Sequence, residues 1–244
     1  MKFNTPTLVT FTAPTCSGKS FILDHFAKED TLVTQIMRVK KPDWKFTPIM
    51  TRVVSTTTRP MRKGERDSVD YYFISMEQSL QMEKEGLFAE LVDFRGVRYG
   101  VTHEEMAWKM NGDLPPGVIL EPLGLSMYEK YVKEHGWDIF KVFVDTPEAV
   151  RIHRLSERTA LDIRNGILDL LQNVTDIGLL DRADMLTIAE KQLAIHSDRM
   201  LSITGDERNW KNANTWDAIV PGDDIHDAIA ILEAAIDKRN QERG

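Results

Sequence analysis

Hydrophobic and polar positions along the chain follow two periods, one typical of buried strands and one typical of amphipathic helices. Short apolar, β-branched runs predict strands at residues 8–12, 49–56, 88–94, 97–99, 118–121, 139–144 and 216–220. Apolar positions spaced three and four apart predict helices at residues 20–26, 75–86, 102–111, 125–135, 147–158 and 225–238. This alternation of strands and helices predicts an α/β fold in which a parallel core sheet is flanked by helices.

Two further helical stripes lie in the third quarter of the chain. One consists of Ile163, Ile167, Leu170, Leu171 and Val174, and the other of Leu186, Ala189 and Leu193. Their spacing predicts a helical hairpin. The two stripes are expected to pack on each other, and a homodimer interface is the alternative.

The residues between the first predicted strand and its helix carry the first candidate chemistry. Residues 13–20 read Ala-Pro-Thr-Cys-Ser-Gly-Lys-Ser. A strand, a tight loop and Gly-Lys-Ser at a helix start are typical of a phosphate-binding loop, with Ala13 where the usual pattern has Gly. Lys19 is expected to neutralise the outer phosphates and Ser20 to bind Mg²⁺. The nucleotide-binding residues predicted here are Pro14, Thr15, Cys16, Ser17, Gly18, Lys19 and Ser20.

Composition narrows the class of protein. The chain has 244 residues and a net charge of −7, which gives no general attraction to nucleic acid or anionic membranes. Its single cysteine excludes an internal disulfide and a cysteine zinc site, and its six histidines are scattered. No secretory signal and no membrane-spanning apolar run are visible, so we predict a cytoplasmic protein.

A second candidate anion site lies around two arginines. Arg59 and Arg62 present planar donor groups three residues apart, and Tyr71 adds a hydroxyl. The run from Ser55 to Phe73 resembles the guanylate kinase motif S-x-T-T-R-x-P-R-x-G-E followed by D-Y-x-F. In that family the motif forms the pocket for the nucleoside monophosphate.

The resemblance extends to the base pocket. It implies that Glu90 accepts the N1 and N2 hydrogens of guanine and that Tyr99 contacts the acceptor phosphate, while Ser55 can donate to the O6 edge. Val101 stands where the family usually has Ser or Thr, and Leu123 stands where an Asp helps to read the exocyclic amine. The acceptor therefore stays open between GMP or dGMP and another deoxy- or modified-base monophosphate.

Three more charged residues complete the candidate site. Glu121 ends a predicted buried strand, where an α/β sheet places ligands, and can hold Mg²⁺ through water or pair with a nearby arginine. Residues 154–158 resemble the family's R-L-x-x-R, which implies that Arg158 reaches the donor phosphates. Arg199 is the best match to a later family arginine.

The resemblance implies a single guanylate-kinase-like domain over residues 1–244 with a P-loop NTPase fold. Its expected parts are a core at 1–50, 106–152 and 209–244, a small mixed-sheet monophosphate-binding lobe at 51–105, and a helical lid at 153–208. The implied reaction is transfer of the ATP γ-phosphate to GMP or dGMP with Mg²⁺, with Lys19, Arg59, Arg158 and Arg199 as catalytic residues. A non-catalytic module that binds a partner's phosphopeptide is the rival.

Overall fold

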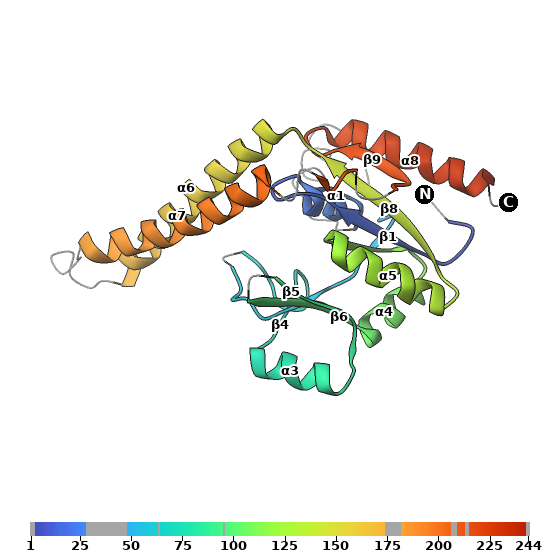
Figure 1. Ribbon diagram of the computed structural model, residues 1–244, viewed down its shortest axis with the longest axis horizontal. Coiled ribbons are helices and arrows are strands. Elements are labelled where there is room, and N and C mark those ends of the chain that lie inside the picture. Colours follow the sequence, from blue (N-terminus) through green and yellow to red (C-terminus); the bar gives the residue numbers. More distant parts are fainter. Residues whose placement is uncertain are drawn as a thin grey trace, which may run out of the picture.

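The computed structural model describes residues 3–27, 48–62, 64–94, 96–173, 182–205, 209–212 and 215–242. Within these ranges the chain forms a parallel core sheet, a smaller mixed sheet and a long helical hairpin (Figure 1). The predicted fold class is thus confirmed. Most of residues 29–48, expected to hold a helix end and a loop, and Val174 lie outside the described residues.

The core sheet is built around β1 (Thr7–Thr12), every residue of which is buried. Its five strands are parallel and follow the order β2-β7-β1-β8-β9. β1 pairs with β7 (Pro116–Leu120) on one side and with β8 (Asp138–Asp145) on the other, and β2 (Thr51–Arg52) and β9 (Ala218–Pro221) are the edge strands. Because all five strands point the same way, the loops that follow them meet at one edge of the sheet.

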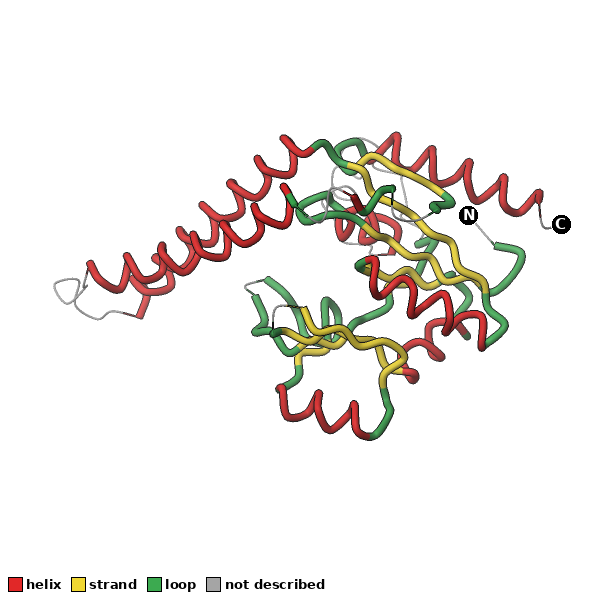
Figure 2. Tube along the Cα trace, in the orientation of Figure 1, coloured by secondary structure: helices red, strands yellow, loops and turns green. Residues whose placement is uncertain are grey.

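Helices cover both faces of this sheet (Figure 2). They are α1 (Lys19–Ala27), α4 (His103–Met110), α5 (Pro122–Glu134) and α8 (Ile225–Glu242). Alternate residues of β1 pack on opposite sides, as the strand period requires: Val9 joins α1 and α8 in one core, and Leu8 joins α4 and α5 in the other. The result is a three-layer arrangement in which the central strand β1 is fully buried.

The second sheet has the order β4-β3-β6-β5 and lies below the core in Figure 1. Its strands are β3 (Thr56–Thr57), β4 (Tyr72–Phe73), β5 (Phe88–Phe94) and β6 (Val97–Thr102), and α3 (Met76–Lys84) follows β4. One pair, β3 with β4, is parallel and the others are antiparallel. We call this sheet, α3, the loops between these elements and the adjoining Ser55 the lobe.

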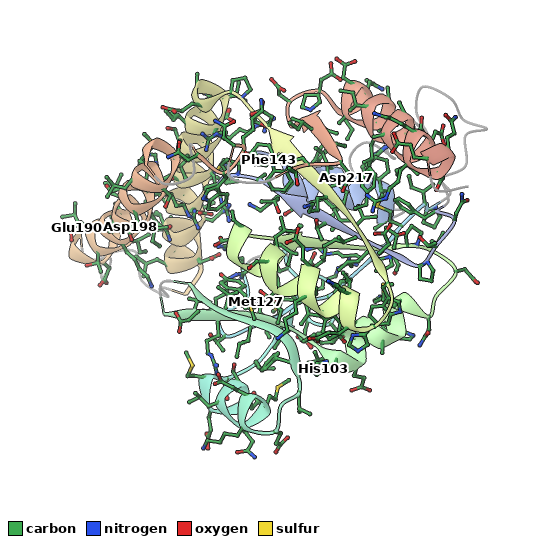
Figure 3. The ribbon with its side chains drawn as sticks, turned by 45° about the vertical axis from the view of Figure 1, so that its right-hand side comes forward. His103, Met127, Phe143, Glu190, Asp198 and Asp217 are labelled. Carbon is green, nitrogen blue, oxygen red and sulfur yellow. The ribbon has the colours of Figure 1, made fainter. Side chains whose placement is uncertain are left out.

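The hairpin projects from the core into solvent (Figure 1). It consists of α6 (Glu148–Asn173) and α7 (Arg182–Thr204), which pack against each other. Thr159 Oγ1 lies 2.9 Å from His196 Nδ1, and a Cβ on Gly166 would lie 2.7 Å from Ile188 Cγ2. Figure 3 shows Glu190 and Asp198 on the outside of α7.

Several predicted boundaries were wrong. The predicted strand at residues 49–56 is two strands, β2 in the core sheet and β3 in the lobe, because the chain passes from one sheet to the other between them. The predicted helix at 147–158 continues to Asn173 and includes the first hairpin stripe as far as Leu171, and the last strand begins at Ala218. None of the described helices has both the length and the apolar character needed to cross a bilayer.

Candidate active site

The phosphate-binding loop connects β1 to α1. Cys16 and Gly18 adopt left-handed backbone conformations, with φ of 63° and 91°. The buried Ala13, which replaces the usual Gly of the pattern, is not among the positive-φ residues, so its methyl group costs little. The loop ends where α1 begins at Lys19, so it lies at the N-terminus of a helix, which favours an anion.

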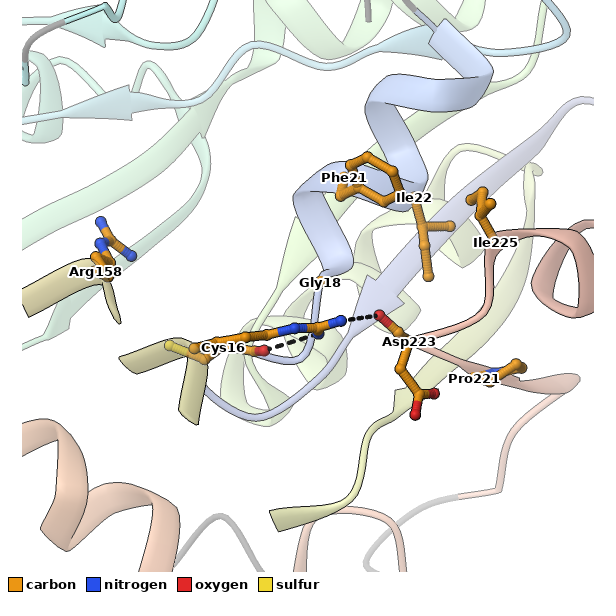
Figure 4. Close-up of a pocket in the computed structure, with 10 residues that line it drawn as sticks. Cys16, Gly18, Phe21, Ile22, Arg158, Pro221, Asp223 and Ile225 are labelled. Atoms are coloured by element: carbon orange, nitrogen blue, oxygen red, sulfur yellow. Dashed lines mark hydrogen bonds between the residues drawn. The ribbon is translucent and has the colours of Figure 1, made fainter. Parts of the chain in front are cut away.

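Residues far away in the sequence hold this loop in place. The Thr146 hydroxyl donates to the Ser17 carbonyl at 2.8 Å. The Arg154 guanidinium donates to the carbonyls of Cys16 and Gly222, at 3.3 and 3.0 Å (Figure 4). Sequence reasoning missed both residues as loop contacts, although Arg154 is the first arginine of the R-L-x-x-R match.

The turn after β9 approaches the loop so closely that only glycines fit. A Cβ on Gly222 would lie 1.9 Å from the Ser17 carbonyl oxygen, and one on Gly18 would lie 2.8 Å from the Gly222 carbonyl oxygen. Such separations are far below van der Waals contact. The phosphate loop and the end of β9 therefore form one rigid unit.

A cavity of about 570 Å³ opens beside this unit (Figure 4). Its apolar wall is Phe21, Ile22, Pro221 and Ile225, and its polar wall includes Cys16, Arg158 and Asp223. Apolar side chains next to a phosphate-binding loop suit a planar base whose phosphates lie on the loop.

A second cavity, of about 270 Å³, brings both predicted anion sites together. The phosphate loop contributes Thr15, Cys16 and Lys19, the lobe contributes Ser55, Arg62, Tyr71, Glu90 and Tyr99, the end of β7 contributes Glu121, and the hairpin contributes Arg158 and Arg199. Cys16 and Arg158 line this cavity and also the first one. The two cavities are thus adjacent.

The arginines in the second cavity repel one another. Burial, followed by the charges of Arg158, Arg59 and Arg199, lowers the pKa of Arg62. Burial and Arg158 likewise lower the pKa of Arg199. An anion between these guanidinium groups would relieve the repulsion.

Arg59 does not line this cavity, in contrast to the other predicted acceptor residues. Its guanidinium is 9% exposed and makes two hydrogen bonds to the Glu65 carboxylate, at 2.5 and 2.7 Å. Glu65 also accepts from the Arg62 N–H at 2.8 Å. In this structure Arg59 therefore fixes Glu65, and Glu65 fixes the backbone of Arg62.

The far end of the second cavity is acidic. Glu90 is 7% exposed, and burial together with the nearby charge of Glu121 raises its pKa to about 7. Gly124, in the first turn of α5, leaves room for this carboxylate, because a Cβ there would lie 3.1 Å from Glu90 Oε1. The cavity thus joins a cationic end to an end with two carboxylates.

The other residues of the phosphate-binding loop differ in exposure and in hydrogen bonding. Pro14 and Ser17 are buried, and the Ser17 N–H donates to the Pro14 carbonyl at 3.3 Å, so these two residues shape the loop. Lys19 Nζ donates to the Ala13 carbonyl at 3.2 Å, and the Ser20 side chain is exposed. No group of three or more His, Cys, Asp or Glu side chains suited to a metal ion occurs in the described part of the chain.

Comparisons with known proteins all identify guanylate kinases as similar to this chain. The family model described as guanylate kinase matches residues 9–160. The guanylate kinase of Chlorobium luteolum is 29% identical over 182 residues, which cover 74% of this chain and 82% of that protein. The guanylate kinase of Helicobacter hepaticus is 28% identical over 170 residues, covering 67% and 83%.

A solved structure shares the fold. The crystal structure of guanylate kinase from Anaplasma phagocytophilum aligns with a TM-score of 0.53 over 98% of this chain and 89% of that chain, at 15% identity. The match to the family model ends within α6 at residue 160, so the far part of the hairpin lies beyond it.

Proposed function

The chain belongs to the guanylate kinase family, and from this premise we propose that it transfers the γ-phosphoryl group of ATP to GMP or dGMP. The observation that carries the proposal is the cavity that Lys19 shares with Arg62, Arg158 and Arg199. Four cationic side chains from three parts of the chain suit two phosphate groups in close proximity.

On the donor side, the phosphates of ATP would lie on the loop and α1, with the adenine in the cavity of Phe21 and Ile225. Lys19 exchanges its bond to Ala13 for the outer phosphates. Arg158, which lines both cavities, is suited to the phosphoryl group in transit, and Arg199 assists it. The rigid unit of loop and β9 turn positions these groups before substrate arrives.

On the acceptor side, Arg62, Tyr71 and Tyr99 would hold the phosphate. This phosphate is itself the nucleophile, so the reaction needs alignment and charge neutralisation and no general base. Arg59 acts through Glu65, as a positioning residue for Arg62.

The two carboxylates favour guanine. Guanine presents the N1 hydrogen and the exocyclic amine side by side, and Glu90 and Glu121 line the cavity together. A uracil-like base has one N–H between two carbonyls, so a second carboxylate would face an acceptor. Donors from the base stabilise the charged form of Glu90 and return its pKa toward the ordinary range. Ser55 is available to donate to O6.

The oxygen atoms of Ser20 and Glu121 suit a magnesium ion that binds together with the nucleotide. Mg²⁺ keeps several waters and binds one or two protein oxygens plus substrate phosphates. The exposed Ser20 hydroxyl at the start of α1 suits this role, and Glu121 can contribute through water. When bound, the ion neutralises charge on the β- and γ-phosphates.

Two further predictions concern the packing of the hairpin and the cellular compartment of the enzyme. Leu161, Leu168, Leu171, Leu186, Leu193 and Leu201 are exposed on α6 and α7. A homodimer through this surface is the alternative to helices that pack only on each other. The acidic composition and single cysteine agree with a cytoplasmic enzyme.

A coupled assay of ADP release over all ribo- and deoxynucleoside monophosphates tests the function. We expect GMP and dGMP to give the highest kcat/KM, with Mg²⁺ required. Faster turnover of another monophosphate would show that this compound, and not GMP or dGMP, is the preferred acceptor. Absence of ADP release with every monophosphate, while the protein still binds a phosphopeptide or GMP, would favour the non-catalytic module.

A further inference from the structure

The lobe is joined to the core by two passages of chain. The first is residues 53–55, which lead from β2 to β3. The second is α4, which leads from β6 back toward β7 and lies between the core and the lobe in Figure 1. Figure 3 labels His103, the first residue of α4. Any movement of the lobe relative to the core must be absorbed at these passages.

One buried carboxylate links both passages. Glu105 lies in the first turn of α4 and is 5% exposed. Its Oε1 accepts the Val54 N–H at 2.8 Å, and its Oε2 accepts the Tyr72 hydroxyl at 3.2 Å. A carboxylate on α4 therefore holds the other passage and strand β4 at once.

Val54 is the point at which the chain leaves the core sheet. The preceding N–H, of Val53, still donates to the Gly117 carbonyl of β7 at 2.9 Å. The next N–H, of Val54, is inside the protein and has Glu105 as its acceptor. Without this acceptor a buried donor would be unsatisfied, which favours a different path of the chain at this position.

Both partners of Glu105 are next to residues of the acceptor cavity. Ser55 follows Val54, and Tyr71 precedes Tyr72. The Tyr72 N–H also donates to the Ser55 carbonyl at 2.9 Å, so the two segments are bonded to each other. Because successive strand residues point to opposite faces, Tyr71 and Tyr72 face opposite sides of the lobe sheet. A shift of Tyr72 on one side moves Tyr71 on the other.

The Glu105 carboxylate is anchored on its own helix. The Thr102 hydroxyl caps α4 by accepting from the Glu105 N–H at 3.2 Å, and Lys109 Nζ lies 3.8 Å from Glu105 Oε1. The acid also sits at the positive end of the helix. These contacts fix the carboxylate with respect to the core, since α4 packs on it through Met106 and Met110.

We propose that Glu105 is a positioning residue for the acceptor site, which sets the place of Ser55 and Tyr71 relative to the core through Val54 and Tyr72. The proposal rests on the function proposed above. It assigns Glu105 no contact with substrate. Its role is to place the residues that hold the acceptor, so that the acceptor phosphate is in line with the donor when the lobe approaches the core.

The test is steady-state kinetics with GMP and ATP varied separately. Glu105→Ala should raise KM for GMP about tenfold and leave KM for ATP within about twofold, since one charged hydrogen-bond acceptor is lost on the acceptor side only. Glu105→Gln should restore most of the activity, because its amide oxygen accepts from Val54 and its amide group can donate to the Tyr72 hydroxyl. Tyr72→Phe removes a single hydroxyl and should raise KM for GMP about threefold in a protein that folds normally.

Glu104→Ala is the matched control, because Glu104 is an exposed acid in the same helical turn. It should leave both KM values unchanged. Equal KM for GMP in wild type, Glu105→Ala and Tyr72→Phe would overturn the positioning role, as would parallel increases in the two KM values. If the wild type does not phosphorylate GMP, the proposed function has failed instead. Even then, hydrogen exchange in the ligand-free protein tests the contact itself. Faster amide exchange at Val54 in Glu105→Ala would support the hydrogen bond from the Val54 N–H to Glu105, and unchanged exchange would refute it.

Discussion

Replacing Glu90 by Gln should make the ligand-free protein more stable, by an amount that grows as the pH rises and is largest at neutral and alkaline pH. Glu90 is buried beside Glu121, and its pKa is raised from an ordinary 4.5 to about 7. The folded protein therefore holds a proton that the unfolded chain has already released between these two values. Folding becomes less favourable as the pH rises through this window, and the penalty is complete above it.

The magnitude follows from the two pKa values. One pKa unit corresponds to about 1.4 kcal/mol, so the full penalty is roughly 3 kcal/mol. About 2.5 kcal/mol of it develops between about pH 5 and about pH 8, because part of the window lies below pH 5. A glutamine has no proton to lose and keeps a similar shape. We therefore expect Glu90→Gln to gain about 2–3 kcal/mol relative to wild type on going from about pH 5 to about pH 8.

Urea unfolding at a series of pH values, without nucleotides, measures this difference. Glu233→Gln on the exposed side of α8 is the control for loss of one negative charge, and its effect on the free energy of unfolding should not change between the two pH values. Glu121→Gln should lower the folded-state pKa of Glu90, because burial then remains as its cause without the charge of Glu121. The loss of stability should therefore be complete at a lower pH and be smaller than in wild type. A Glu90→Gln effect that is the same at both pH values would refute the reasoning. The same variant should lose preference for GMP, since the carboxylate acceptor is lost.

Two other predictions concern the anion sites. Gly222→Ala should raise KM for ATP at least tenfold in the coupled assay and lower the melting temperature. The new Cβ would lie 1.9 Å from the Ser17 carbonyl oxygen and would displace the phosphate loop. An unchanged KM for ATP would show that the loop and the β9 turn are not one unit. Arg62→Ala should raise KM for GMP without loss of stability. Arg59→Ala should raise KM for GMP and also lower the free energy of unfolding by about 2–3 kcal/mol, because the Glu65 carboxylate loses both guanidinium hydrogen bonds and keeps the Arg62 N–H as a hydrogen-bond donor. Equal urea midpoints for the two arginine variants would contradict the different roles given to them.

Local sequence determined much of this fold. The first strand, its loop and α1 are consecutive, and the positions of Gly18, Lys19 and Ser20 alone predict an anion site at a helix start. The capping box of α3 is also local: the Ser75 side chain accepts from the Gln78 N–H, and the Gln78 side chain accepts from the Ser75 N–H. Such features depend on residues within one turn of each other, so no knowledge of the topology is needed.

The tertiary structure decided which distant groups meet. Arg154 binds carbonyls 138 and 68 residues away, and Glu105 binds an N–H 51 residues away. The raised pKa of Glu90, which comes from burial and then from the charge of Glu121, likewise depends on how the lobe sits against β7. Arg59 shows a different limit: its partner Glu65 is only six residues away, but whether a buried arginine turns to that carboxylate or to the cavity depends on the packing around it. Periodicity and motifs predict most of the elements and their local polar groups, whereas element boundaries such as the division of residues 49–56 into β2 and β3, and the distances between elements, depend on how the sheets and helices pack together.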